Sequence, residues 1–111
     1  TGDALVPDLA GWRRDRMPRI PNTPVFSLAP DWICEVLSPS TYRWDRGPKM
    51  RVYARAGVEW LWFIDPLAEG LEIHRLQEGQ WRLHGVHLGS GTVNAVPFDA
   101  VPLNLSRLWS R

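Results

Sequence analysis

The run WICEVL, residues 32–37, contains one carboxylate, Glu35, in the middle of apolar residues. Side chains alternate between the two faces of a strand, so Glu35 shares its face with Ile33 and Leu37. The opposite face is apolar as well, which is typical of a central strand. A lone buried charge is costly unless another group compensates it. The sequence therefore predicts that Glu35 meets a partner from another element.

The residues that follow this first strand predict a helix and then a second strand. We expect a helix near residues 45–56, with Asp45 as N-cap, Pro48 in the first turn and Gly57 at the C-terminal stop. The run EWLWFID at 59–65 is typical of a second buried strand. Two strands joined by a helix predict a crossover unit.

The remaining chain predicts short strands separated by turns. We expect strands at 5–12, 71–77, 80–88 and 92–98, a proline-containing connection at 13–30, and a short helix at 104–109. A chain of 111 residues is long enough for one domain. The predicted class is α/β, with a mixed sheet, a crossover helix and an antiparallel C-terminal meander.

The net charge of +1 is unevenly distributed along the chain. Residues 13–55 carry nine Arg and Lys against four acidic residues. This balance favours an anionic partner, although arginines in solvated loops would give the same count. No apolar run is long enough to cross a membrane. The single cysteine, Cys34, is expected to be a small buried residue and is compatible with a reducing, cytoplasmic setting.

Lys49 is the predicted partner of Glu35. On a helical wheel it falls inside an apolar arc that includes Val52 and Tyr53, so it points toward the sheet. Arg51 lies opposite, facing water. The two inward charges have opposite signs, and one interpretation is a structural ion pair.

Asp8, in the segment VPD, allows a second interpretation. Two carboxylates, Asp8 and Glu35, suffice to hold a hard divalent cation with positions open for a phosphate. A lysine beside them can orient a water or stabilise charge at the phosphate. This combination is typical of metal-assisted phosphodiester hydrolysis. The three histidines, His74, His84 and His87, are expected to be exposed strand residues.

Four segments carry a family resemblance: VPDLAGWRRDR, PDWICEVLSPST, DRGPK and YARAGVEWLWFIDP. Together they resemble the Uma-two family of restriction-endonuclease-like proteins, within the PD-(D/E)xK nuclease-like superfamily. The resemblance covers nearly the whole chain. It implies a restriction-endonuclease-like core that hydrolyses DNA phosphodiester bonds with Mg²⁺ or Mn²⁺.

The family pattern implies a role for each site residue. Asp8 would be the first metal carboxylate, Glu35 the second, and Lys49 the catalytic lysine. The superfamily usually places the lysine two residues after the glutamate, where this chain has Leu37. A lysine moved to the following helix accounts for this departure. Family members also have an N-terminal helical segment, which we expect this single domain, residues 1–111, to lack.

DNA is the partner that the resemblance implies, and five arginines are candidates for holding its backbone: Arg13, Arg14, Arg16, Arg43 and Arg46. The leading hypothesis is a metal-dependent endonuclease. The alternatives are a non-catalytic nucleic-acid-binding module, or a structural module that forms a homo-oligomer, on the same fold. In the structural module the Glu35–Lys49 pair is only an internal ion pair.

Overall fold

The computed structural model describes residues 7–17, 29–38 and 42–109, with side chains of the helix described from residue 46 onward. Within these ranges the elements are β1 (Leu9–Gly11), β2 (Trp32–Val36), α1 (Tyr42–Ala56), β3 (Trp60–Asp65), β4 (Gly70–Gln77), β5 (Gln80–Leu88), β6 (Thr92–Val93), β7 (Leu103–Asn104) and α2 (Ser106–Trp109). None of the described helices is long and apolar enough to cross a membrane.

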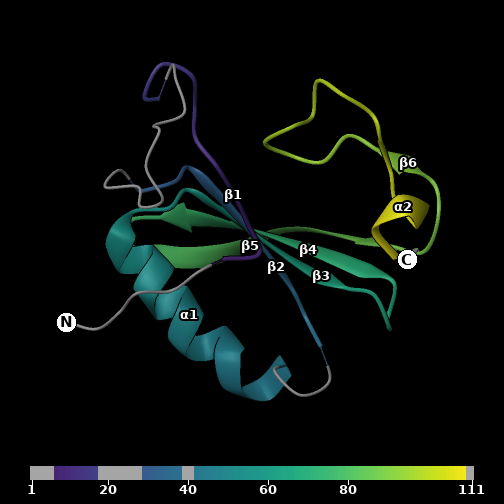
Figure 1. Ribbon diagram of the computed structural model, residues 1–111, viewed down its shortest axis with the longest axis horizontal. Coiled ribbons are helices and arrows are strands. Elements are labelled where there is room, and N and C mark those ends of the chain that lie inside the picture. The colour runs from purple at the N-terminus through teal and green to yellow at the C-terminus, as the bar shows by residue number, and fades with distance from the viewer. Residues whose placement is uncertain (1–6, 18–28, 39–41, 110–111) are drawn as a thin grey trace.

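Five strands form one mixed sheet in the order β1-β2-β3-β4-β5 (Figure 1). β2 and β3 are parallel and are connected through α1, while the other neighbouring pairs are antiparallel. The predicted α/β class, the crossover unit and the antiparallel meander from β3 to β5 are therefore confirmed. β2 lies between two other strands, as its two apolar faces predicted.

The parallel pair forms the centre of the sheet because its strands are buried on both faces. β3 has no charge between Trp60 and Ile64, and four of its residues are buried. In β2, Cys34 is 1% exposed, as predicted. The parallel register places Glu35 beside Phe63. This register fixes which side chains of the two strands share a face.

Each face of the sheet packs its own apolar cluster. The cluster under α1 contains Ile33, Leu37, Tyr53, Val58, Leu61 and Phe63. The opposite cluster contains Cys34, Trp62, Ile64, Leu71, Ile73, Ala95 and Leu105. Residues 92–109 supply the cover of this second face, and Figure 1 shows α1 on one side of the sheet with β6 and α2 on the other.

Helix α1 begins earlier than the capping signals predicted. It begins at Tyr42, so Asp45 lies inside the helix and the prediction of an N-cap there is wrong. Pro48 is an interior residue instead of a first-turn residue. An interior proline lacks one helical hydrogen bond, and contacts with the sheet decide the helix bounds more than local propensity does. The C-terminal stop is confirmed, since Gly57 follows the helix with a φ of 79°.

The C-terminal segment also differs from prediction. The expected strand at 92–98 is limited to β6, which pairs with β7, a strand that the sequence patterns did not indicate. A loop replaces the rest: the Phe98 amide donates to the Ala95 carbonyl, and the Asn94 side chain donates to the Asp99 carbonyl. The predicted closing helix is confirmed as the short α2, whose start is capped by the side chain of Asn104.

Candidate functional site

One row of side chains crosses the sheet on the face that α1 covers. Glu35 is paired with Phe63 across β2 and β3, and Phe63 is paired with Glu72 across β3 and β4. Cross-strand partners lie on the same face of a sheet. Two carboxylates therefore flank one aromatic ring beneath the helix.

Glu35 meets two partners, both from α1. Its side chain is almost fully buried, with 3% of the residue exposed. The Tyr53 hydroxyl donates a hydrogen bond to Oε1, and the Lys49 Nζ donates to Oε2 at 3.5 Å. The inward position predicted for Lys49 is confirmed. Tyr53 was counted only as an apolar ring of the helix, so its hydroxyl bond was missed.

Asp8 lies beside Glu35, immediately before β1. β1 and β2 are antiparallel with Leu9 opposite Cys34, so the residue before Leu9 falls next to Glu35. The Asp8 Oδ2 accepts a hydrogen bond from the Val36 amide at 2.7 Å. Asp8 is exposed whereas Glu35 is buried. The two carboxylates thus combine one solvated and one desolvated group.

The electrostatics of the site follow from this burial. Desolvation raises the pKa of Glu35, the Tyr53 hydrogen bond and the Lys49 charge oppose that rise, and the Asp8 charge adds to it. Burial also raises the pKa of Tyr53, and the adjacent Glu35 raises it further. The tyrosine therefore keeps its proton and acts as the donor.

The inward side of α1 carries polar groups at helical spacing. Arg46, Lys49 and Tyr53 follow one another at intervals of three and four residues, so they lie on one side of the helix. Each contacts a carboxylate of the sheet. Trp81 of β5 adds a fourth contact by donating to the Met50 carbonyl at 2.8 Å. These contacts hold the helix over the row that contains Glu35.

A second polar cluster lies farther along the same face. Arg46 donates through both terminal nitrogens to Glu72, and its guanidinium lies 4.6 Å over the centre of the Phe63 ring. The His74 Nε2 is 3.0 Å from Glu72 Oε1. Burial alone would raise the pKa of Glu72, but the bonds from Arg46 and His74 lower it below its ordinary value.

His74 does not match its prediction. It is 8% exposed instead of being an exposed strand residue. Burial lowers its pKa and the adjacent Glu72 opposes that effect. The alternation in LEIHR carried a signal, because Glu72 and His74 share one face while Leu71 and Ile73 point to the other. His84 is exposed, as predicted.

The arginines proposed to hold DNA lie in different environments. Arg13, Arg14 and Arg16 are exposed in the turn after β1. Arg13 pairs with Asp15 at 2.8 Å, and Arg16 pairs with Asp31 at 2.5 Å. Arg43 is in α1, but its side chain lies outside the described residues. The Arg46 side chain is 23% exposed and points toward Glu72 rather than away from the protein.

The donor set of the site suits a hard cation. Within residues 7–17, 29–38 and 42–109, no three His, Cys, Asp or Glu side chains gather into a metal-binding group. Asp8 and Glu35 would supply two carboxylates, a number with which Mg²⁺ is commonly bound when waters and phosphates complete its shell. Cys34 is no competing thiolate ligand, because burial first, and then the charges of Asp8 and Glu35, raise its pKa to about 12.

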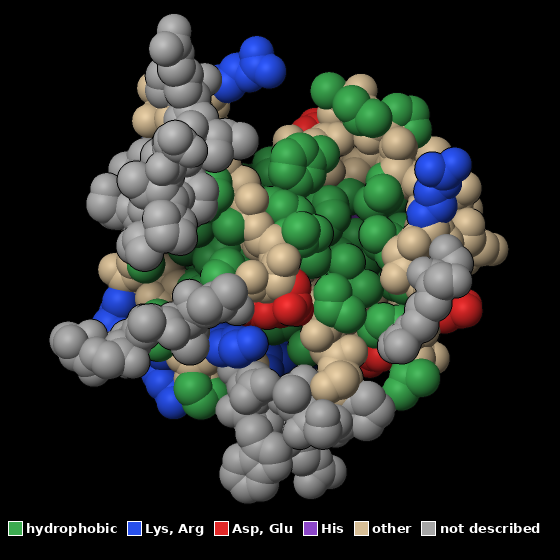
Figure 2. Space-filling view, viewed as in Figure 1, with side chains coloured by type: hydrophobic (Ala, Val, Ile, Leu, Met, Phe, Trp, Pro, Cys, Tyr) green, Lys and Arg blue, Asp and Glu red, His purple; other side chains and the backbone are tan. Residues whose placement is uncertain are grey.

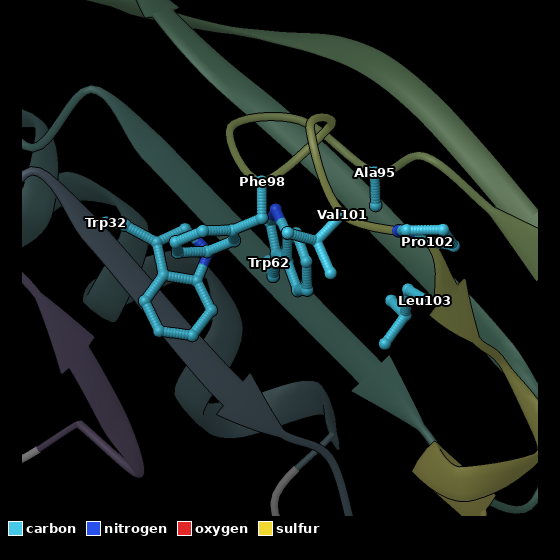
Figure 3. Close-up of a pocket in the computed structure, with 7 residues that line it drawn as sticks. All are labelled: Trp32, Trp62, Ala95, Phe98, Val101, Pro102 and Leu103. Atoms are coloured by element: carbon cyan, nitrogen blue, oxygen red, sulfur yellow. The ribbon is translucent and has the colours of Figure 1, made fainter.

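The opposite face has a hollow of different chemistry. A pocket of about 210 Å³ lies between the sheet and the loop after β6. It is lined by apolar side chains, shown in Figure 3: Trp32, Trp62, Ala95, Phe98, Val101, Pro102 and Leu103. Figure 2 shows apolar side chains gathered over the middle of the molecule in this view. Without a titratable lining group, the pocket has no means of acid–base or metal chemistry.

The mixed sheet with its crossover helix is a restriction-endonuclease-like fold. The chain belongs to the Uma2 family, described as "Putative restriction endonuclease", whose model matches residues 1–106. Families of this kind generally use a divalent metal ion. Among curated proteins, none matches the chain significantly.

A solved structure is similar over most of the chain. It is the crystal structure of a "putative nuclease belonging to DUF820" from Anabaena variabilis ATCC 29413. The two sequences are 25% identical and the TM-score is 0.68. The match covers 95% of this chain and 59% of the other, so this chain spans about three fifths of that relative's length.

Proposed function

We propose that the protein is a metal-dependent endonuclease that hydrolyses phosphodiester bonds of DNA. The observation that carries this proposal is the convergence of Asp8, Glu35 and Lys49, which come from three separate elements of the chain. Membership of the Uma2 family and likeness to a protein described as a nuclease support the reaction class.

The roles follow from the charge of each group. Asp8 and Glu35 would hold Mg²⁺ or Mn²⁺, which supplies Lewis-acid polarisation of the phosphate and activation of water when bound. Lys49 is a partly exposed cation, with 25% of its side chain accessible. Its ammonium stabilises negative charge that develops on the phosphate oxygens. The arrangement thus separates metal binding from charge stabilisation.

DNA would approach along the basic part of the surface. Arg13, Arg14 and Arg16 form an exposed basic turn that follows β1 directly, close in sequence to Asp8. Neutralising backbone phosphates releases counterions, so affinity should fall linearly with salt on logarithmic scales. Replacing these three arginines by Ala should flatten that slope in a fluorescence titration with duplex DNA.

The test of the enzyme proposal is cleavage of supercoiled plasmid with Mn²⁺. We expect nicking by the parent protein and a loss of roughly a hundredfold or more for Lys49→Ala, the scale for removing one preorganised electrostatic group. Asp8→Asn and Glu35→Gln should be inactive. Arg51→Ala is the matched control, because Arg51 is on α1 but faces solvent.

The same assay separates the rival functions. A parent that binds duplex DNA without cutting it under any divalent metal would be a nucleic-acid-binding module. A parent that neither binds nor cuts DNA would leave Glu35 and Lys49 as an internal ion pair of a structural module. Parent-like nicking by Lys49→Ala would remove this residue from the mechanism.

A further inference from the structure

Tyr53 and Lys49 both contact Glu35, but they are held to different degrees. Tyr53 is 4% exposed and packs in the apolar cluster with Leu61 and Phe63, so its ring has little freedom. The Lys49 side chain is 25% exposed, and its long stem lets the ammonium turn toward water. The rigid partner is therefore the tyrosine.

The two partners use different oxygens of Glu35. The Tyr53 hydroxyl donates a hydrogen bond to Oε1. The Lys49 ammonium is 3.5 Å from Oε2, longer than the roughly 2.7–2.9 Å of a strong charge-assisted hydrogen bond. Oε1 is thus bonded to a buried group, whereas Oε2 is bonded to a partly exposed group that is able to move away.

We propose that Tyr53 is a positioning residue that fixes Oε1 of Glu35 and thereby presents Oε2 to a divalent cation. This inference rests on the proposed function, in which Glu35 binds metal. Hydrogen bonds that orient a metal ligand are commonly worth roughly 10–100-fold in metal affinity. Lys49 competes with the metal, because its ammonium is bonded to Oε2, the oxygen that the cation would bind.

The experiment measures Mn²⁺ affinity by calorimetric titration of the parent, Tyr53→Phe and Lys49→Met. Tyr53→Phe keeps the ring and removes only the hydroxyl. We expect its affinity to fall at least tenfold. Lys49→Met should bind Mn²⁺ as tightly as the parent or more tightly. A loss of Mn²⁺ affinity in Tyr53→Phe and no loss in Lys49→Met are the signature of the proposed division.

Trp81→Phe is the matched control. Trp81 also makes one hydrogen bond between the sheet and α1, by donating to the Met50 carbonyl. This bond does not involve Glu35. Trp81→Phe and Tyr53→Phe should both lose stability in urea unfolding, but Trp81→Phe should keep the Mn²⁺ affinity of the parent. The control thus separates a general loosening of the helix from a specific effect on the carboxylate.

Each outcome decides between positioning and simple packing. Tyr53→Phe with Mn²⁺ affinity within twofold of the parent would overturn the proposal, because the hydroxyl would then only satisfy a buried acid. If Tyr53→Phe does not fold, the hydroxyl is required by the fold itself, and the proposal is overturned as well. A parent that binds no Mn²⁺ would overturn the proposed function itself, and this inference with it.

Discussion

The two faces of the sheet contain different kinds of core. The face under α1 buries Glu35 and His74 among apolar side chains, with Arg46 and Lys49 reaching in from the helix. The opposite face packs a cluster made of apolar side chains such as Leu71 and is covered by residues 92–109. Both faces belong to the same strands, so alternation along each strand separates the two chemistries.

The difference suggests a division between stability and function. An apolar cluster stabilises a domain through burial alone, whereas buried charges contribute little net stability and are costly to leave unpaired. A protein that retains Glu35 in such surroundings does so at a cost in stability. That cost is expected at functional sites, where groups with perturbed pKa values gather.

The largest expected effect on stability comes from a substitution in the apolar cluster on the face opposite α1. Leu71→Ala should lower the free energy of unfolding by about 2–5 kcal/mol, the range for truncating a fully buried leucine. The Mn²⁺ affinity of the folded variant should equal that of the parent. Urea unfolding and calorimetric titration measure the two quantities. A large loss of affinity would show that the two faces are not separable in function.

The next largest effect on stability is expected at one of two Arg–Glu pairs. In each pair the guanidinium lies over an aromatic ring of β3. Arg46 binds Glu72 through two nitrogens and is 23% exposed, whereas Arg75 binds Glu59 at 3.0 Å and is 41% exposed. Arg46→Met should cost about 1.5–3 kcal/mol of stability, the range for hydrogen bonds to charged groups.

Arg75→Met is the control for that prediction, and it should cost at most about 1 kcal/mol because exposed ion pairs are weak. Urea unfolding of both variants provides the comparison. Equal costs for the two variants would show that position under α1 gives the Arg46 pair no added strength.

The smallest expected effect is a change in how folding stability depends on pH. Folding raises the pKa of Glu35 above its ordinary 4.5, chiefly through burial. The folded protein then holds this proton more tightly than the unfolded chain, so stability falls as pH rises from 4.5 through the raised pKa. Glu35→Gln should remove that fall and be at least as stable as the parent at pH 8. Parallel stability–pH curves for parent and variant would contradict this assignment.

The elements that the sequence predicted best are those whose patterns reflect burial. The runs of β2 and β3 are apolar on both faces, so both strands were expected to be buried in the sheet. The helix between them then predicted a crossover connection. The inward direction of Lys49 followed from the wheel alone. Bounds that depend on tertiary contacts were predicted less well, as the early start of α1 and the loop in place of a strand after Val93 show.

The candidate site was predictable only in part. Asp8 and Glu35 were singled out, but their proximity depends on the β1–β2 register, which is not visible in either segment alone. The Tyr53 hydroxyl was missed because its ring fits an apolar arc. Glu72 and His74 were missed because only the pairing of β4 with β3 brings them into the row beneath α1.

The central claim is that Asp8 and Glu35 together bind a divalent metal ion, and calorimetric titration with Mn²⁺ tests it most directly. The parent should bind Mn²⁺, and Asp8→Asn and Glu35→Gln should each lose that binding while remaining folded by urea unfolding. Asp65→Asn is the control, because Asp65 caps the turn after β3 by accepting the Leu67 and Ala68 amides. Parent-like Mn²⁺ binding by both site variants would contradict the account.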